Sequence, residues 1–158
     1  MARLVTVDTY SRMFQFKILN NILYLNDRLF LMSIVNCPLC SLCKTETETF
    51  DHFFVECNIT ISLWNSLQSH FSDTLNFDNI SPQSAVLGFL DENDNDKIIK
   101  NHILLMFKFF LFKFRNKYPT FDFLISFIRN VEVIERKLIH VGQATYHNEK
   151  WDKILPFL

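Results

Sequence analysis

The chain has little of what turn-rich, exported or membrane-bound proteins need. Only two of its 158 residues are glycine and four are proline, which favours helices over a β architecture with many tight turns. Residues 1–10 lack the continuous apolar core of a secretory signal. The most apolar run, 103–114, has twelve residues and contains two lysines, whereas a membrane span needs about twenty apolar residues. We therefore expect a helical protein without a membrane anchor, located in the cytoplasm, the nucleus or both.

Motifs of several enzyme and ligand-binding classes are also missing. The chain has no glycine-rich phosphate loop and no recognisable arrangement of serine, histidine and aspartate for nucleophilic catalysis. The acidic run Asp91 to Asp96, DENDND, lacks the glycine at the sixth position and the distant glutamate that a calcium-binding loop requires. This run predicts a solvated acidic loop.

The residues that are abundant indicate one well-filled domain. Hydrophobic residues make up 49% of the chain and aromatic residues 15%, with eighteen phenylalanines. A chain of this length buries roughly 68–70% of its extended surface. Such a composition is far from that of a disordered protein. We expect a mainly α protein, a single helical domain of five or six helices around a phenylalanine-rich core.

Apolar residues recur every three or four positions in the first half, as on one face of a helix. A first helix is capped by Asp8 or Thr9, and its apolar stripe comprises Phe14, Ile18, Ile22 and Leu25. Asn26-Asp27 interrupts it and caps a short second turn. Asn58 caps a later helix, with the adjacent Trp64 packing it against the segment before, and its stripe comprises Ile59, Leu63, Leu67 and Phe71.

The second half shows the same periodicity. Ser81-Pro82 predicts a helix start and Gly88 its end. The longest predicted helix, 97–117, is stopped by Pro119. Thr120 caps the next, with Gly142 as its terminator, and its inward stripe comprises Leu124, Phe127, Val131, Ile134 and Leu138. The last segment, with Trp151 and Phe157, is expected to fold back onto the rest.

The segment 37–64 has the residues of a zinc site. Cys40, Cys43, His52 and Cys57 follow the spacing C-x2-C-x8-H-x4-C. Zinc takes thiolate and imidazole donors, usually four in a tetrahedron, and four protein donors leave no open position for a substrate. His52 and Cys57 are five positions apart, roughly 140° around a regular helix. Any helix that carries His52 should therefore end or distort before Cys57.

Two alternatives remain open on spacing alone. Cys37 forms a second C-x2-C pair with Cys40, so three sulfurs compete for two positions. The cysteines could instead be buried or paired in disulfides, which is less expected because cytosolic thiols stay reduced.

The chain resembles the reverse-transcriptase zinc-binding domain found at the C-terminal end of LINE-type (non-LTR) retrotransposon proteins. The residues that carry this resemblance are PLCSLC at 38–43, the pair Glu48-Thr49, HFFVEC at 52–57 and the pair Leu63-Trp64. The lead-in 16–30, the RNKYP at 115–119 and the closing HNEKW at 147–151 are also similar to such proteins.

The resemblance implies one structural Zn2+ per chain, held by Cys40, Cys43, His52 and Cys57 as a CCHC knuckle inserted in the helical domain, with Cys37 not required. It also implies contact with element RNA or target DNA and with an upstream reverse-transcriptase domain. A polymerase needs paired catalytic aspartates, and the chain contains no Asp-Asp. We therefore expect a module that is not an enzyme, either a fragment or the C-terminal domain of a longer polyprotein.

Charge divides the chain unevenly around its total of −1. Residues 1–36 carry four basic and two acidic side chains, 37–96 carry one and ten, and 97–158 carry eleven and five. A nucleic-acid binder needs a basic face more than a basic total. We predict phosphate contacts from Arg12, Lys17, Arg28, Lys97, Lys108, Arg115 and Lys117. The alternative is that these long side chains only cover the apolar core.

The predicted organisation is a helical lead-in at 1–36, a zinc-binding segment at 37–64, an acidic connection at 65–96 and basic phenylalanine-rich helices at 97–158. The predicted function is a zinc-stabilised nucleic-acid-binding module. The alternative is a zinc-stabilised protein-interaction scaffold without nucleic-acid contact.

Overall fold

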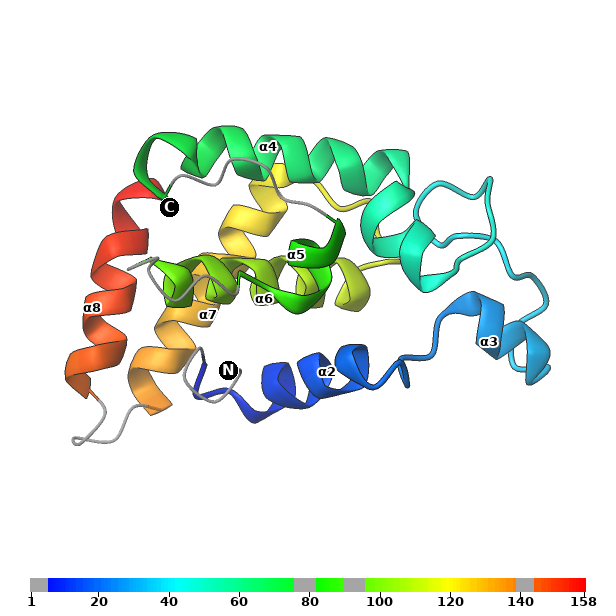
Figure 1. The fold of residues 1–158 in the computed structure, drawn as a ribbon, viewed down its shortest axis with the longest axis horizontal. Helices are drawn as coiled ribbons and strands as arrows, with labels where there is room; N and C mark the ends of the chain where they lie inside the picture. The colour runs from blue at the N-terminus through cyan, green and yellow to red at the C-terminus, as the bar shows by residue number, and fades with distance from the viewer. Residues whose placement is uncertain (1–5, 76–81, 90–95, 139–143) are drawn as a thin grey trace.

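The computed structural model describes residues 6–75, 82–89, 96–138 and 144–158 (Figure 1). This part of the chain is mainly helical, as predicted. Its elements are α2 (Thr9–Leu19), α3 (Asn26–Leu31), the π-helix η1 (His52–Glu56), α4 (Asn58–Leu75), α5 (Pro82–Leu87), α6 (Lys97–Lys113), α7 (Phe121–Leu138), α8 (Ala144–Ile154) and the short 3-10 helix η2 (Leu155–Phe157). No helix in the described residues is long and apolar enough to cross a membrane.

Helix α6 is the centre of the fold. It contacts α2, α7 and α8, and Figure 1 shows it between α4 along one edge and α2 along the other. Nearly every side chain from Ile99 to Leu111 is buried, as expected for a helix that is apolar on all sides. The apolar run 103–114 is therefore the core helix of a globular domain.

Aromatic rings fill the space around α6. The Trp64 ring of α4 lies 4.0 Å from that of Phe107, centroid to centroid. The ring of Phe14 on α2 lies 5.2 Å from that of Phe109. At the end of α6 the rings of Phe110 and Phe127 are 5.6 Å apart. These contacts join α2, α4 and α7 to one core, as the phenylalanine content predicts.

Several predicted helix ends are confirmed by their hydrogen bonds. The Asp8 carboxylate accepts from the backbone N–H groups of Tyr10 and Ser11 at the start of α2, and the Thr120 hydroxyl accepts from Phe123 N at 3.2 Å. Gly88 ends α5 with φ +86°, and a Cβ there would collide with the Asn101 amide. That amide bonds both backbone groups of Phe89, so α5 is tied to α6.

Other expectations differ from the structure. Helix α2 ends at Leu19, so the side chain of Ile22 is exposed while Leu25, beyond the helix, is buried. Helix α6 ends at Lys113 rather than at 117, because the chain turns at Phe114 before it reaches Pro119. On α7, Ile134 is 54% exposed; the buried face instead contains Glu135 at the next position. Ser81, the run 91–95 and Gly142 lie outside the described residues.

A buried polar cluster joins the C-terminal helices, and we call it the Glu135 cluster. The Glu135 carboxylate of α7 accepts from Lys150 Nζ at 2.8 Å and from Trp151 Nε1 at 2.9 Å, both on α8. It also accepts from the Thr6 hydroxyl, and His102 Nε2 of α6 lies 3.7 Å from it. All five residues are at least 97% buried. The predicted docking of the Trp151 segment therefore rests on an ion pair as well as on apolar packing.

Candidate metal centre

The four predicted donors converge on one point. One ligand atom from each of Cys40, Cys43, His52 and Cys57 lies within 4.8 Å of all the others. The sulfurs of Cys40 and Cys57 are 4.0 Å apart, and Cys43 Sγ lies 3.3 Å from His52 Nε2. Zinc–ligand bonds of about 2.0–2.3 Å set the edges of a tetrahedral site at roughly 3.5–3.8 Å. The donor set and its spacing therefore fit one Zn2+.

A short hairpin presents the first two donors. Leu39 and Thr47 form an antiparallel bridge, and Cys40 N donates to Glu46 O at 2.7 Å. Within the turn, Lys44 N donates to Cys40 O at 2.9 Å, and Lys44 has the left-handed φ of +62°. The loop from Cys40 to Lys44 thus curls tightly, and both sulfurs point to the same side.

A π-helix presents the other two donors. Cys57 N donates to His52 O at 2.7 Å, which is an i to i+5 hydrogen bond, and Cys57 itself is extended with ψ 128°. The wider π turn brings residues five apart onto one side, where a regular helix would separate them. The predicted distortion before Cys57 is therefore confirmed. The Thr49 hydroxyl accepts from His52 N at 3.1 Å and helps to begin the turn.

The Glu48 carboxylate accepts hydrogen bonds from the loops around the donor cluster. The sequence did not indicate this role. The Glu48 side chain is fully buried. It accepts from the backbone N–H of Asn26 at 3.0 Å and from that of Ser41, and Arg115 Nη1 lies 3.5 Å away. Through its bond to Asn26, Glu48 caps the start of α3 from a buried position. The available signal was the pair Glu48-Thr49 among the residues that carry the family resemblance.

Aromatic side chains close the inner side of the site. Phe53 and Phe54 are fully buried, with ring centroids 4.8 Å apart. Trp64 Nε1 donates to Phe54 O at 2.9 Å, and the Thr60 hydroxyl donates to Phe53 O at 2.8 Å. These bonds fasten η1 to α4. Phe53 and Phe54 thus form a local core beside the donors and are not free to stack on nucleic-acid bases.

The two cysteines of the first pair have different proton affinities. Burial raises the pKa of Cys40 to about 12, against hydrogen bonds from the N–H groups of Cys43 and Leu42. At Cys43 burial acts in the same direction. There, hydrogen bonds from Thr45, from the N–H of Glu46 and from His52 outweigh burial and lower the pKa to about 6. A cation is therefore needed to hold Cys40 as a thiolate at neutral pH.

Comparison with known proteins agrees with this geometry. Residues 6–64, which include all four donors, match the protein-family model described as zinc-binding in reverse transcriptase. The matched segment is thus similar to the zinc-binding domains of reverse transcriptases. The chain matches no curated protein and no solved structure. The matched segment contains α2, α3, the hairpin, η1 and the start of α4, and it includes Glu48 together with its partners Asn26 and Ser41.

Cys37 lies outside the donor cluster of the zinc-binding domain. Its side chain is exposed, and it is not among the residues whose ligand atoms converge. The four cysteines are free thiols, with no disulfide among them. The structure therefore places Cys37 as the bystander that the family resemblance implies.

Two of the predicted phosphate-contacting residues are internal. Lys108 is 2% exposed, and its Nζ donates to Gln15 Oε1 at 2.9 Å and to Val86 O at 3.0 Å. Arg115 is 17% exposed and is held by Glu48. The prediction of phosphate contact was therefore wrong for Lys108, because its position on α6 faces α2 and α5. Arg115 instead supports the zinc-binding domain.

The remaining predicted cations lie nearer the surface. Lys17 and Lys117 are exposed, while Arg12, Arg28 and Lys97 are partly buried. Arg12 donates to Val7 O at 3.3 Å, and Arg28 donates to Asn21 O. Lys117 Nζ lies 5.8 Å from the centroid of the Phe114 ring. The Lys117 side chain thus lies beside an aromatic ring, while Lys17 faces solvent; phosphate contact from the exposed cations stays a prediction.

Proposed function

We propose that Cys40, Cys43, His52 and Cys57 bind one structural Zn2+. The supporting observation is the convergence of these donors inside a segment of a zinc-binding family. Four protein ligands would complete the tetrahedral shell and leave no position for a reacting water. The proposal therefore includes a non-catalytic role for this metal.

The test is metal content. Zinc-loaded protein should contain one zinc per chain by atomic absorption, and Cys43→Ser should lose it. Cys37→Ser is the matched control and should retain it. Retention by Cys43→Ser together with loss by Cys37→Ser would transfer the ligand role to Cys37.

We infer that the chain is a nucleic-acid-binding module of a LINE-type reverse-transcriptase protein, acting in the cytoplasm, the nucleus or both. Two features support this inference. One is the family match of residues 6–64. The other is a pair of exposed cations, Lys17 in the last turn of α2 and Lys117 beyond the end of α6. Element RNA and target DNA are the proposed partners. Each neutralised phosphate releases counterions, so log affinity should fall against log salt by about 0.7–0.9 per contact.

A binding assay across salt tests this function. Zinc-loaded protein is titrated with structured RNA and with duplex DNA, and Lys17→Glu with Lys117→Glu should weaken binding and flatten the salt slope by about 1–2. Lys137→Glu is the matched control, because it is exposed in the last turn of α7. That end of α7 lies opposite the zinc-binding loops (Figure 1). Equal loss in the control would attribute the effect to net charge alone.

An exposed apolar face favours the alternative function, a protein-interaction scaffold. Helix α2 uses Phe14 and Ile18 for the core yet also carries apolar side chains on its outer side. We call the exposed set the α2–α3 face: Tyr10, Met13, Phe16, Leu19, Ile22, Tyr24, Phe30, Leu31, Met32 and Ile34. Solvent-facing patches of this kind mark interaction sites. Because the family is described within reverse transcriptases, the proposed occupant is the polymerase domain of such a protein.

The two functions separate by mutation. Phe16→Glu with Leu31→Glu should abolish a complex with a LINE-type polymerase domain in light scattering. The zinc content of this variant should not change, because both side chains point to solvent. A dimer of this chain alone, broken by the same substitutions, would assign the face to a second copy and contradict the polymerase proposal.

A further inference from the structure

A groove lies between the zinc-binding loop and the turn that follows α6, and we call it the knuckle groove. Its volume is about 200 Å³, and the residues that line it include Ser41, Lys44, Arg115, Lys117 and Tyr118. Ser41 and Lys44 come from the loop that carries Cys40 and Cys43, whereas the other three follow the end of α6. The groove therefore exists only where the zinc-binding domain meets the rest of the chain.

The Ser41 hydroxyl is a buried polar group that points to a ligand. Ser41 is 6% exposed, and among the described residues its Oγ has no hydrogen-bond partner. Its backbone N–H, by contrast, donates to Glu48. An unpaired buried hydroxyl costs free energy that a bound partner recovers. Ser41 is among the residues that line the groove, so rotation of its hydroxyl toward a bound ligand would supply that partner.

The charge of the groove favours an anion. Lys44 and Lys117 are exposed cations on its two sides, and no acidic side chain lines it. Lys44 is the one basic residue of segment 37–96, which carries ten acidic ones. It directly follows Cys43, and its left-handed backbone belongs to the donor loop. The zinc-binding loop thus places the only cation of the acidic segment at this groove.

Tyr118 adds an aromatic surface beside these cations. Its side chain is 92% exposed, which leaves the faces of the ring open to a flat partner. Nucleic-acid bases stack on such rings when they are unpaired. A volume of about 200 Å³ is below the roughly 300–1,000 Å³ of small-molecule pockets, so the groove suits one unit of a longer chain better than a complete small ligand.

We propose that the knuckle groove binds one nucleotide of a single-stranded nucleic acid. The base stacks on Tyr118, the flanking phosphates contact Lys44 and Lys117, and the Ser41 hydroxyl hydrogen-bonds the nucleotide. Paired bases in a duplex have no free faces, so the groove selects single strands. This inference rests on the proposed nucleic-acid-binding function and deepens it by naming the form of nucleic acid that is bound.

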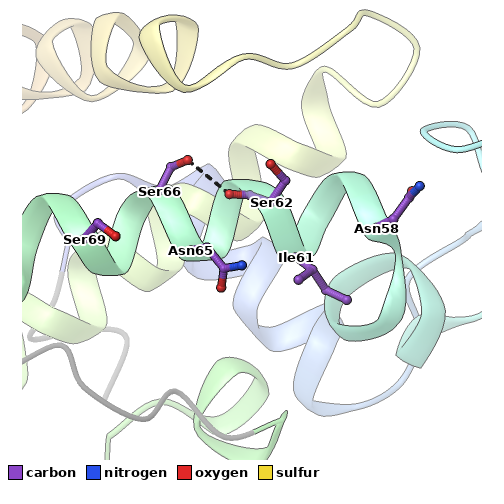
Figure 2. Close-up of a pocket in the computed structure, with 6 residues that line it drawn as sticks. All are labelled: Asn58, Ile61, Ser62, Asn65, Ser66 and Ser69. Atoms are coloured by element: carbon purple, nitrogen blue, oxygen red, sulfur yellow. Dashed lines mark hydrogen bonds between the residues drawn. The ribbon is translucent and has the colours of Figure 1, made fainter.

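A second hollow, on α4, lacks the cations and the aromatic ring that line the knuckle groove. It runs along α4 and is lined by Asn58, Ile61, Ser62, Asn65, Ser66 and Ser69 (Figure 2). These side chains come from a single helix and include neither a cation nor an aromatic ring. The hollow therefore offers polar contacts without the means to neutralise phosphate or to stack a base, and it serves as the control surface.

The experiment uses zinc-loaded full chain and fluorescence anisotropy with labelled oligonucleotides: dT12, rU12 and a 12-base-pair duplex. Tyr118→Ala should weaken binding to the single strands about 5- to 100-fold, while Tyr118→Phe should bind like the wild type. Lys44→Gln and Lys117→Gln should each lower the salt slope by about 0.7. Asn65→Ala, on the control surface, should leave affinity unchanged. If Ser41→Ala weakens binding to rU12 more than binding to dT12, the Ser41 hydroxyl contacts the ribose of the bound nucleotide.

The outcomes separate this inference from the function on which it rests. If the wild type binds none of the three probes, the nucleic-acid-binding function itself fails. If the wild type binds single strands and Tyr118→Ala binds them equally well, the groove proposal is overturned while the function stands. A loss on Tyr118→Ala that is equal for duplex and single strands would also overturn it. Because Tyr118 is 92% exposed, its substitution should not disturb folding, and zinc content verifies this.

Discussion

The two ends of the molecule each bury a polar cluster, but they are assembled in opposite ways. The zinc donors lie at one end within eighteen consecutive residues, 40–57. The Glu135 cluster lies at the α7–α8 end and joins Thr6, His102, Glu135, Lys150 and Trp151 from four parts of the chain. Figure 1 shows these ends on opposite sides of the molecule. A metal organises donors that are already close in sequence, whereas an ion pair of distant residues requires the fold first.

This difference in assembly predicts which parts of the fold depend on the zinc site and which depend on the Glu135 cluster. Among the described residues the zinc-binding hairpin has a single isolated bridge and no longer strand pairing, so it should need its metal. The helices α6, α7 and α8 contact one another through a continuous aromatic core and should tolerate metal loss. The predictions below test this division from the largest effect to the smallest.

The largest effect is expected on removing zinc. Structural zinc contributes about 10–16 kcal/mol in small peptides, as much as the roughly 5–15 kcal/mol that stabilises a whole domain. Chelation, or Cys57→Ser, should therefore unfold residues 37–57 while the Trp151 environment remains native. Hydrogen exchange followed by mass spectrometry measures both regions at once. Cys37→Ser is the control. Simultaneous exchange of α7 and α8 would break the proposed division.

The next effect is expected on removing the buried carboxylate. Glu135→Gln leaves the Lys150 ammonium buried without its counter-charge, and such a loss costs about 3–5 kcal/mol. Urea denaturation should show this decrease while zinc content stays at one per chain. The double variant Glu135→Gln with Lys150→Met removes the stranded charge and should recover part of the loss. Zinc loss in Glu135→Gln would instead show that the two ends are coupled.

The same carboxylate predicts sensitivity to acid. Burial opposes ionisation, but the charges of His102 and Lys150 outweigh it and lower the pKa of Glu135 from 4.5 to about 2. The stabilisation is present above the unfolded pKa and should be lost as the pH falls from 4.5 towards 2. Wild type and Glu135→Gln should therefore converge in stability over this range. A constant difference between them would show that the charge of Glu135 does not stabilise the fold.

A smaller effect concerns Lys108, whose Nζ is buried against neutral oxygens. Burial lowers its pKa from 10.5 to about 7. Above pH 7 the folded protein releases a proton that the unfolded chain retains, so stability should rise with pH by up to about 1.4 kcal/mol per unit. Lys108→Met should flatten this rise between pH 7 and about 10 in zinc-loaded protein. Lys113→Met, exposed on the same helix, is the control and should keep it.

The smallest effect on stability is expected from substituting Arg136, one position after Glu135. Arg136 contacts Glu132 and lies 3.1 Å from Asp152, but its side chain is 35% exposed. Solvent screens such pairs, which contribute about 0.2–1 kcal/mol. Thermal denaturation of Arg136→Ala should therefore show a far smaller change than Glu135→Gln. An equal loss of stability in the two variants would mean that the exposed pairs of Arg136 stabilise the packing of α7 against α8 as strongly as the buried Glu135 does.

Helix positions were predictable where local rules apply. The caps at Asp8 and Thr120, the end at Gly88 and the distortion before Cys57 follow from short-range geometry, and each is observed. Errors arose where helical periodicity alone was used to assign a side chain to the inside. Ile134 is exposed and Glu135 is buried, because α7 faces Lys150 and Trp151 of α8, which no local pattern reveals.

The sequence by itself determined the helical class, the aromatic core and the donor set of the metal site, because each depends on residues within a few turns of one another. Only the tertiary structure decided the fate of the charged residues. Lys108 and Arg115 were both predicted to contact phosphate. Lys108 is instead buried between α2 and α5, and Arg115 pairs with Glu48. Whether a charge meets solvent, a carboxylate or a carbonyl depends on elements far away in sequence. The knuckle groove has the same origin, since Ser41 and Tyr118 come together only when the end of α6 packs beside the zinc-binding loop.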